Sequence, residues 1–118
     1  PLALAFVARG REYRSEFHID PCDEVMYMIR GDMRLHCLTL EDTEELTLLT
    51  QGSIIHTPAG VPHSPDFPLD AFVLVMERKP TSGEIDLFHW YCPACDEFLH
   101  EETFIVEDYR VDPVPKTY

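Results

Sequence analysis

Residues 52–63 read Gly52-Ser-Ile-Ile-His-Thr-Pro58-Ala-Gly60-Val-Pro-His63. A short, largely apolar run over 53–57 leads into a turn in which proline and glycine recur, and the stretch closes on a histidine. Short runs rich in β-branched residues are typical of strands, and Pro and Gly end them. We therefore expect a strand over 53–57, a tight turn after it, and His63 on a different strand or loop.

The rest of the chain repeats this alternation of short strand-like runs and turn residues. The runs expected to form strands cover 2–7, 13–18, 25–29, 33–40, 46–49, 53–57, 71–76 and 98–106. Turn signals recur about every 8–12 residues, and no stretch combines helical periodicity with both caps. The pattern predicts an all-β fold, a small antiparallel β-barrel or jelly roll.

Prolines punctuate one segment of this pattern, at positions 58, 62, 65 and 68. Proline cannot donate a hydrogen bond to a sheet ladder. We therefore expect the segment to be rich in loops or to lie at the edge of a sheet.

Length and charge limit the kind of protein that the sequence encodes. The chain has 118 residues, and nine Lys and Arg against 22 Asp and Glu give a net charge of −13. This length fits one domain, 1–118, with 92–118 as a C-terminal extension. The negative charge opposes binding to nucleic acid or to anionic membranes. No apolar run reaches the length of a membrane-spanning helix, so we expect a soluble, cytoplasmic protein.

A second stretch carries a related spacing of glycine, histidine and glutamate. It reads Gly10-Arg-Glu-Tyr-Arg14-Ser-Glu16-Phe-His18-Ile-Asp-Pro-Cys-Asp-Glu24-Val-Met-Tyr-Met-Ile-Arg-Gly31. Together, the two stretches resemble the two sequence motifs of the cupin superfamily, which implies a single-domain cupin fold. The first motif departs from the superfamily twice, because Glu16 replaces its leading histidine and the gap from His18 to Glu24 is long.

Three residues in these motifs form a candidate metal site. His18, Glu24 and His63 supply two imidazoles and one carboxylate, the facial triad that leaves open positions on Fe(II). His18 and Glu24 are six residues apart, and this even spacing lets both point into a barrel. The alternative is that each is a solvated or hydrogen-bonded side chain at a strand end. Zn, Ni or Mn also suit such a site.

Further residues resemble the 3-hydroxyanthranilate 3,4-dioxygenase family. They are 14–32, 58–65, Met76-Glu77-Arg78-Lys79-Pro80 and Phe88-His-Trp90-Tyr91-Cys92-Pro-Ala-Cys95. That family opens an aromatic ring with Fe(II) and O2. The resemblance implies that Arg14 binds the substrate carboxylate and that Glu77 lies near the substrate amine, where it could accept a proton. Without the resemblance, both would be ordinary strand charges.

Position 67 departs from this family. The family has a second arginine there, whereas this chain has Phe67, preceded by Asp66. A carboxylate substrate would lose one of two charged partners. The substrate is then an aminophenol or catechol without that carboxylate, or another basic residue compensates. Phe67 either stacks on the aromatic substrate or packs within a loop.

The four cysteines suggest at most one further site. Cys92 and Cys95 resemble half of a rubredoxin-like site, which needs four thiolates around a structural Fe or Zn ion. A second pair lost with the C-terminus, a site shared between subunits, and a free or redox-active pair all fit the sequence. Cys22 either lines the mouth of the pocket or is a small buried residue.

The resemblance thus implies an Fe(II)-dependent, extradiol-type ring-cleaving dioxygenase. Its partners would be O2 and a small aromatic substrate, either 3-hydroxyanthranilate-like or an ortho-aminophenol. It also implies a homodimer, formed through the apolar run over 2–7. The alternatives are a non-catalytic cupin that binds a metal or small molecule, and a cupin isomerase or thiol oxygenase.

Overall fold

The computed structural model describes residues 3–10, 16–39, 41, 43–78, 83–92, 94–95 and 97–104. Its strands are β1 (Ala3–Arg9), β2 (Glu16–Ile19), β3 (Glu24–Arg30), β4 (Met33–Leu38), β5 (Glu44–Leu49), β6 (Ile54–Thr57), β7 (His63–Asp66), β8 (Phe72–Arg78), β9 (Asp86–Tyr91) and β10 (Phe98–Phe104). These elements are all strands, which confirms the all-β prediction. Nowhere in the described ranges is there a helix of the length and apolar character needed to cross a membrane.

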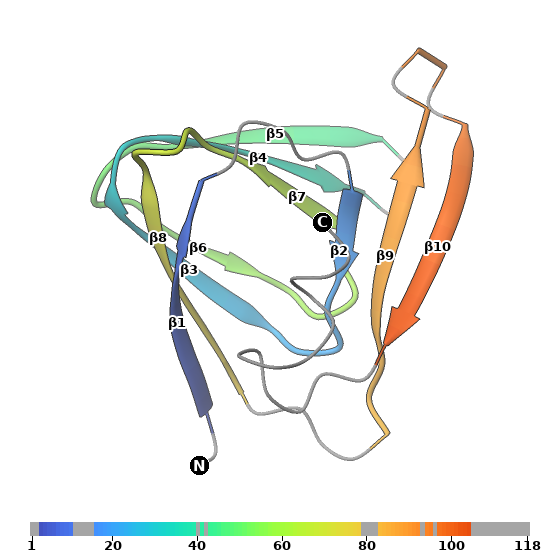
Figure 1. Ribbon diagram of the computed structural model, residues 1–118, viewed down its shortest axis with the longest axis horizontal. Coiled ribbons are helices and arrows are strands. Elements are labelled where there is room, and N and C mark those ends of the chain that lie inside the picture. The colour runs from blue at the N-terminus through green and yellow to red at the C-terminus, as the bar shows by residue number, and fades with distance from the viewer. Residues whose placement is uncertain are drawn as a thin grey trace.

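The strands form two antiparallel sheets that face each other. One sheet has the order β1-β8-β3-β6, and the other has the order β10-β9-β2-β7-β4-β5. Figure 1 shows the two sheets curving around a common interior, with β9 and β10 extending the larger sheet at one side. Within the described ranges no strand pairing joins the two sheets. The fold is therefore a jelly-roll sandwich and not a closed barrel.

The interior changes from charged to apolar along the facing strands. From β3, the side chains of Glu24, Met26 and Met28 point inward and are at most 4% exposed. On the neighbouring β8, Glu77 lies opposite Glu24, and buried valines follow it toward the start of the strand. The apolar cluster consists of Met26, Met28, Met33, Leu35, Leu49, Phe67, Ala71, Val73 and Val75. The acidic end of the interior lies beyond this cluster.

The proline-rich segment is rich in loops, as expected, because Pro58, Pro62 and Pro68 lie outside strands; Pro65 is the exception. The segment contains β7, a strand inside the larger sheet, although Pro65 lies within it. Pro65 pairs with Leu35 of β4, whereas the pairing of β7 with β2 is confined to His63 and His18. Because β2 does not pair with β7 at Pro65, the missing N–H of this proline removes no hydrogen bond between these two strands.

Strand β9 was not among the predicted strands either. It pairs with β2 on one side, from Glu16 opposite Trp90 to Ile19 opposite Leu87. On its other side it pairs with β10, which falls within the segment expected as a C-terminal extension. Asp86 and Phe88 of β9 are buried, so this strand contributes side chains to the interior.

The close approach at Gly10 gives a first testable prediction. Its N–H donates to the carbonyl of Ala71, and a Cβ at this position would lie 1.8 Å from the backbone oxygen of Pro68. We expect Gly10→Ala to lower the free energy of unfolding by about 3 kcal/mol or more, because the backbone must move apart. Chemical denaturation of the purified variant measures this loss.

Gly60→Ala is the control for this prediction. Gly60 also has to change its backbone, since its φ is +80°, but open space surrounds its Cβ position. We expect a cost of only about 1 kcal/mol for Gly60→Ala. Equal stability losses in the two variants would contradict the close approach at Gly10.

Candidate metal centre

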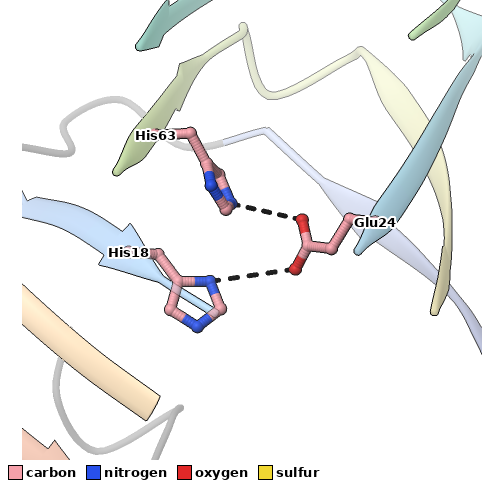
Figure 2. Close-up of side chains that lie close together, drawn as sticks. All are labelled: His18, Glu24 and His63. Atoms are coloured by element: carbon pink, nitrogen blue, oxygen red, sulfur yellow. Dashed lines mark ion pairs between the residues drawn. The ribbon is translucent and has the colours of Figure 1, made fainter. Parts of the chain in front are cut away.

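Three motif residues meet between the two sheets. His18 lies on β2 and His63 begins β7, both in the larger sheet, whereas Glu24 begins β3 in the smaller one. Figure 2 shows the two imidazoles facing the carboxylate. His63 Nε2 lies 3.2 Å from Glu24 Oε2, and His18 Nδ1 lies 3.9 Å from Glu24 Oε1. All three side chains are buried.

The even spacing of His18 and Glu24 is not what brings them together. The two residues lie on different strands in opposite sheets, so the parity argument from a single strand was wrong. The chain crosses between the sheets at 20–23, where Asp20 Oδ1 accepts a hydrogen bond from the Cys22 N–H. This crossing turns Glu24 back toward His18.

A second set of hydrogen bonds ties this crossing to the turn before His63. The Gly60 N–H donates to the backbone oxygen of Asp20 over 2.9 Å. The Ala59 N–H donates to Asp23 Oδ1 over 2.6 Å. The proline- and glycine-rich turn is thereby fixed against the crossing, and His63 is held opposite Glu24.

Each imidazole uses its outer nitrogen for a hydrogen bond. His18 Nε2 lies 2.6 Å from Asp86 Oδ2, and His63 Nδ1 lies 3.1 Å from the backbone oxygen of Val61. Both outer partners are acceptors, so each outer nitrogen carries the proton in the neutral ring. The nitrogens that face Glu24 are then left with lone pairs, which are the form that binds a metal.

The protonation states of the site also suit a cation. Burial lowers the pKa of His18, against the opposing effect of its hydrogen bond to Asp86. Burial opposes ionisation of Glu24, but positive charge at His63 and hydrogen bonds with His63 and Asp20 outweigh it and hold the pKa of this carboxyl below its usual range. A bound cation would supply that positive charge when both imidazoles are neutral ligands. A neutral His18 and an ionised Glu24 are the ligand forms of these side chains.

The interior around the triad is acidic. Its buried ionisable side chains are Glu16, His18, Asp20, Glu24, His63, Glu77 and Asp86. Glu24, a member of this set, lies between the two imidazoles of His18 and His63. Buried carboxylates are costly unless a cation pairs with them. The donor set and its surroundings therefore fit a divalent metal ion bound by His18, Glu24 and His63.

Asp20 is a buried acid that was not among the candidate site residues. One carboxylate oxygen each from Asp20, Glu24 and Glu77 lies within 4.8 Å of the others. Burial, with the neighbouring carboxylates of Glu24 and Glu77, raises the pKa of Asp20 far above its usual range. Asp20 therefore keeps its proton at neutral pH, which reduces the repulsion in this cluster. Glu77 is thus placed beside a proposed ligand.

A family model described as 3-hydroxyanthranilic acid dioxygenase matches residues 2–117. The chain belongs to this family. The match takes in both motif stretches and the strands that carry the three candidate ligands. Enzymes of this family are metal-dependent dioxygenases, in agreement with the donor set between the sheets.

Relatives in bacteria and fungi bear the corresponding enzyme name. A 3-hydroxyanthranilate 3,4-dioxygenase of Bacillus thuringiensis (strain Al Hakam) is 37% identical over 97 residues, which are 82% of this chain and 54% of that protein. The one of Podospora anserina is 32% identical over 86% of this chain and 56% of that protein. The chain thus spans about half the length of the relatives it matches.

Solved structures with low sequence identity share the fold. An RmlC-like cupin from Shewanella frigidimarina superposes with a TM-score of 0.52 at 16% identity, over 69% of each chain. An oxalate decarboxylase superposes with a TM-score of 0.57 at 21% identity, over 70% of this chain and 23% of that one. These likenesses confirm the cupin fold.

Arg14 and Phe67 stand at the two positions where the family has arginines. Arg14 lies outside the described residues. Phe67, at the position of the family's second arginine, is 6% exposed and belongs to the apolar core cluster. It lines a pocket of about 720 Å³ between β4, β5 and 66–69, and none of the three candidate ligands lines that pocket. Its burial favours the packing role, and contact with a substrate stays a prediction.

Asp66 does not add an unpaired charge beside Phe67. Its carboxylate accepts a hydrogen bond from Arg34 over 2.7 Å, and both side chains are exposed. Arg34 and Asp66 are also opposite each other in the pairing of β4 with β7. The pair lies on the outer face of the sheet.

The remaining histidines and the cysteine pair lie apart from the triad. The described groups of metal-ligand atoms within 4.8 Å of one another contain no cysteine. Cys92 is half-buried and Cys95 is exposed. The other four histidines pair with carboxylates: His36 with Glu44, His56 with Asp23, His89 with Glu101, and His100 with Glu102. None of these four belongs to a described group of metal-ligand atoms.

Cys22 supports a second prediction, on thiol reactivity. It is 1% exposed, and burial raises the pKa of its thiol to about 12. Because the thiolate is the reactive form, we expect Cys22 to resist N-ethylmaleimide at pH 8 while Cys95 is modified at once. Mass spectrometry of peptides from the labelled native protein measures both sites.

Denatured protein is the control for accessibility, because there both thiols should react. Cys95→Ser should remove the fast modification and leave Cys22 protected. Labelling of native Cys22 as fast as Cys95 would show that Cys22 lines an open pocket mouth.

Proposed function

We propose that the chain is the metal-binding part of an Fe(II)-dependent dioxygenase that opens an aromatic ring in an extradiol-type reaction. The observation that carries this proposal is the buried triad between the sheets with Glu77 beside it. Membership of the 3-hydroxyanthranilic acid dioxygenase family supports the reaction class. Relatives named 3-hydroxyanthranilate 3,4-dioxygenase support the substrate class.

Each residue of the site has a role in this proposal. His18, Glu24 and His63 hold the metal, and the protonated Asp20 keeps the acidic cluster together. When bound, Fe(II) supplies redox chemistry with O2 and open positions for a substrate that chelates through two ortho heteroatoms. Glu77 accepts the proton that the substrate's amine or hydroxyl gives up. Arg14 would orient a ring carboxylate.

The substrate class follows from the replacement at position 67. Phe67 cannot make the charge-assisted hydrogen bonds of an arginine, and it is packed in the apolar core. We therefore expect an ortho-aminophenol to compete well with 3-hydroxyanthranilate. The ring-opened product is a semialdehyde acid from 3-hydroxyanthranilate and a smaller semialdehyde from 2-aminophenol.

An oxygen electrode with a matched pair of substrates tests this function. The Fe(II)-loaded protein should consume O2 with 2-aminophenol and with 3-hydroxyanthranilate, which differ only by the ring carboxylate. The ratio of their kcat/KM values measures what that carboxylate contributes. Tight binding of both compounds without O2 uptake would instead support a non-catalytic binding module, and uptake only with a thiol would support a thiol oxygenase.

Two further elements belong to the proposal for the whole protein. Strand β1 is an edge of its sheet and exposes Val7 at 57%, which supports pairing with a second copy in a homodimer. Cys92 and Cys95 would contribute two thiolates to a structural Fe or Zn site. Two further ligands would have to come from elsewhere in the chain or from a partner.

A further inference from the structure

Asp86 is a buried acid for which the proposed function gives no role. It is 1% exposed and begins β9, next to β2 in the larger sheet. Its Oδ2 lies 2.6 Å from His18 Nε2, and its Oδ1 has no hydrogen-bond partner among the residues that the structure describes. A carboxylate in such a place is costly unless the imidazole that it touches gains positive character.

Strand β9 holds the His18 ring in two ways. Asp86 and Phe88 are two residues apart, and both are buried in the interior. Phe88 lies opposite His18 in the strand pairing, and its ring meets the imidazole edge to face at 5.2 Å. Asp86 accepts a hydrogen bond from the outer ring nitrogen, Nε2. The packing sets the plane of the ring, and the carboxylate sets which nitrogen carries the proton.

We infer that Asp86 is a positioning residue for the metal centre. By accepting the Nε2–H of His18, it keeps the lone pair on Nδ1, which faces Glu24. It also makes Nδ1 a more basic ligand for the metal, as a hydrogen-bond acceptor at the other ring nitrogen of a metal-ligating histidine does. This inference rests on the proposed function, because it requires a metal at His18, Glu24 and His63.

Co(II) serves as the probe, because its visible spectrum reports ligand geometry independently of turnover. We expect Asp86→Ala to weaken Co(II) binding by about 10- to 100-fold and to alter the visible bands. Asp86→Asn keeps an oxygen acceptor without the charge, so its dissociation constant should fall between those of the wild type and the alanine variant. Near-ultraviolet circular dichroism of the metal-free proteins checks that each variant keeps its packing.

Glu101→Gln is the matched control. Glu101 accepts a hydrogen bond from His89 over 2.6 Å, the same length as the bond between His18 and Asp86. This pair joins β9 to β10 and lies outside the triad. Its substitution should leave both the Co(II) affinity and the spectrum unchanged. A similar loss in Glu101→Gln and Asp86→Asn would overturn the inference, because the effect would then belong to the strand pairing.

The outcomes separate this inference from the proposed function. A wild-type protein that binds no Co(II) contradicts both. Wild-type binding that Asp86→Ala and Asp86→Asn retain, in affinity and spectrum, contradicts the inference alone. If neither variant folds, nitrogen NMR of the Zn(II)-loaded wild type decides: His18 should carry its proton on Nε2, and a proton on Nδ1 would overturn the inference.

Discussion

His63→Ala should abolish ring cleavage and weaken Fe(II) binding by at least about 100-fold. Substituting a residue that hydrogen-bonds to a metal ligand already lowers metal affinity by about 10- to 100-fold, so removing a ligand itself should lower it more. The variant also leaves Glu24 buried without the imidazole that lies 3.2 Å away. Anaerobic titration with Fe(II) measures the affinity, and O2 uptake with 2-aminophenol measures turnover.

His56→Ala is the control for this experiment. His56 belongs to the same sequence motif, but its side chain is 56% exposed and pairs with Asp23 at the surface. We expect its metal affinity and turnover to stay within about twofold of the wild type, because an exposed pair contributes little. Undiminished turnover in His63→Ala would refute the ligand assignment.

Removal of the metal should lower the melting temperature by roughly 10 °C at a metal concentration 100 times the dissociation constant. A ligand at that excess stabilises the folded state by about 2.7 kcal/mol, and each kcal/mol moves the melting temperature of a domain of this size by a few degrees. The physical reason is the buried Glu24: its carboxylate lies between two imidazoles, and a bound cation supplies the full positive charge that two neutral imidazoles lack. Differential scanning calorimetry of chelator-treated and reloaded protein measures the shift.

Two controls give this prediction its specificity. Reloading should restore the melting temperature of the wild type, and His63→Ala should show a much smaller shift between its metal-free and metal-exposed forms. A wild-type protein with the same melting temperature in both forms would mean that the buried acids are stabilised without a cation.

The metal ligands could be predicted because their signal is local. His63 follows a turn whose backbone geometry requires glycine and proline at fixed positions. The spacing of these residues before His63 can therefore be recognised in a single sequence. His18 and Glu24 came from the other motif, and the structure places both within reach of His63. The reason first given for their proximity, even spacing along a strand, was nevertheless wrong, because the chain changes sheet at Asp20-Pro21.

The partners of these ligands could not be predicted, because they depend on pairing between distant strands. Asp86 contacts His18 across 68 positions in the sequence, through a strand that the local pattern did not reveal. Asp20 looked like a turn residue beside Pro21, and only the fold buries it against Glu77. Similarly, Pro65 argued against a strand, and the short pairing between β2 and β7 allowed one.

The most direct test is a crystal structure of the Fe(II)-loaded protein with anomalous diffraction at the iron edge. A strong peak should lie between the two sheets, roughly 2 Å from a nitrogen of His18, a nitrogen of His63 and the carboxylate of Glu24. A peak at Cys92 and Cys95 alone, or no peak among those three side chains in a protein that binds iron in solution, would contradict the account.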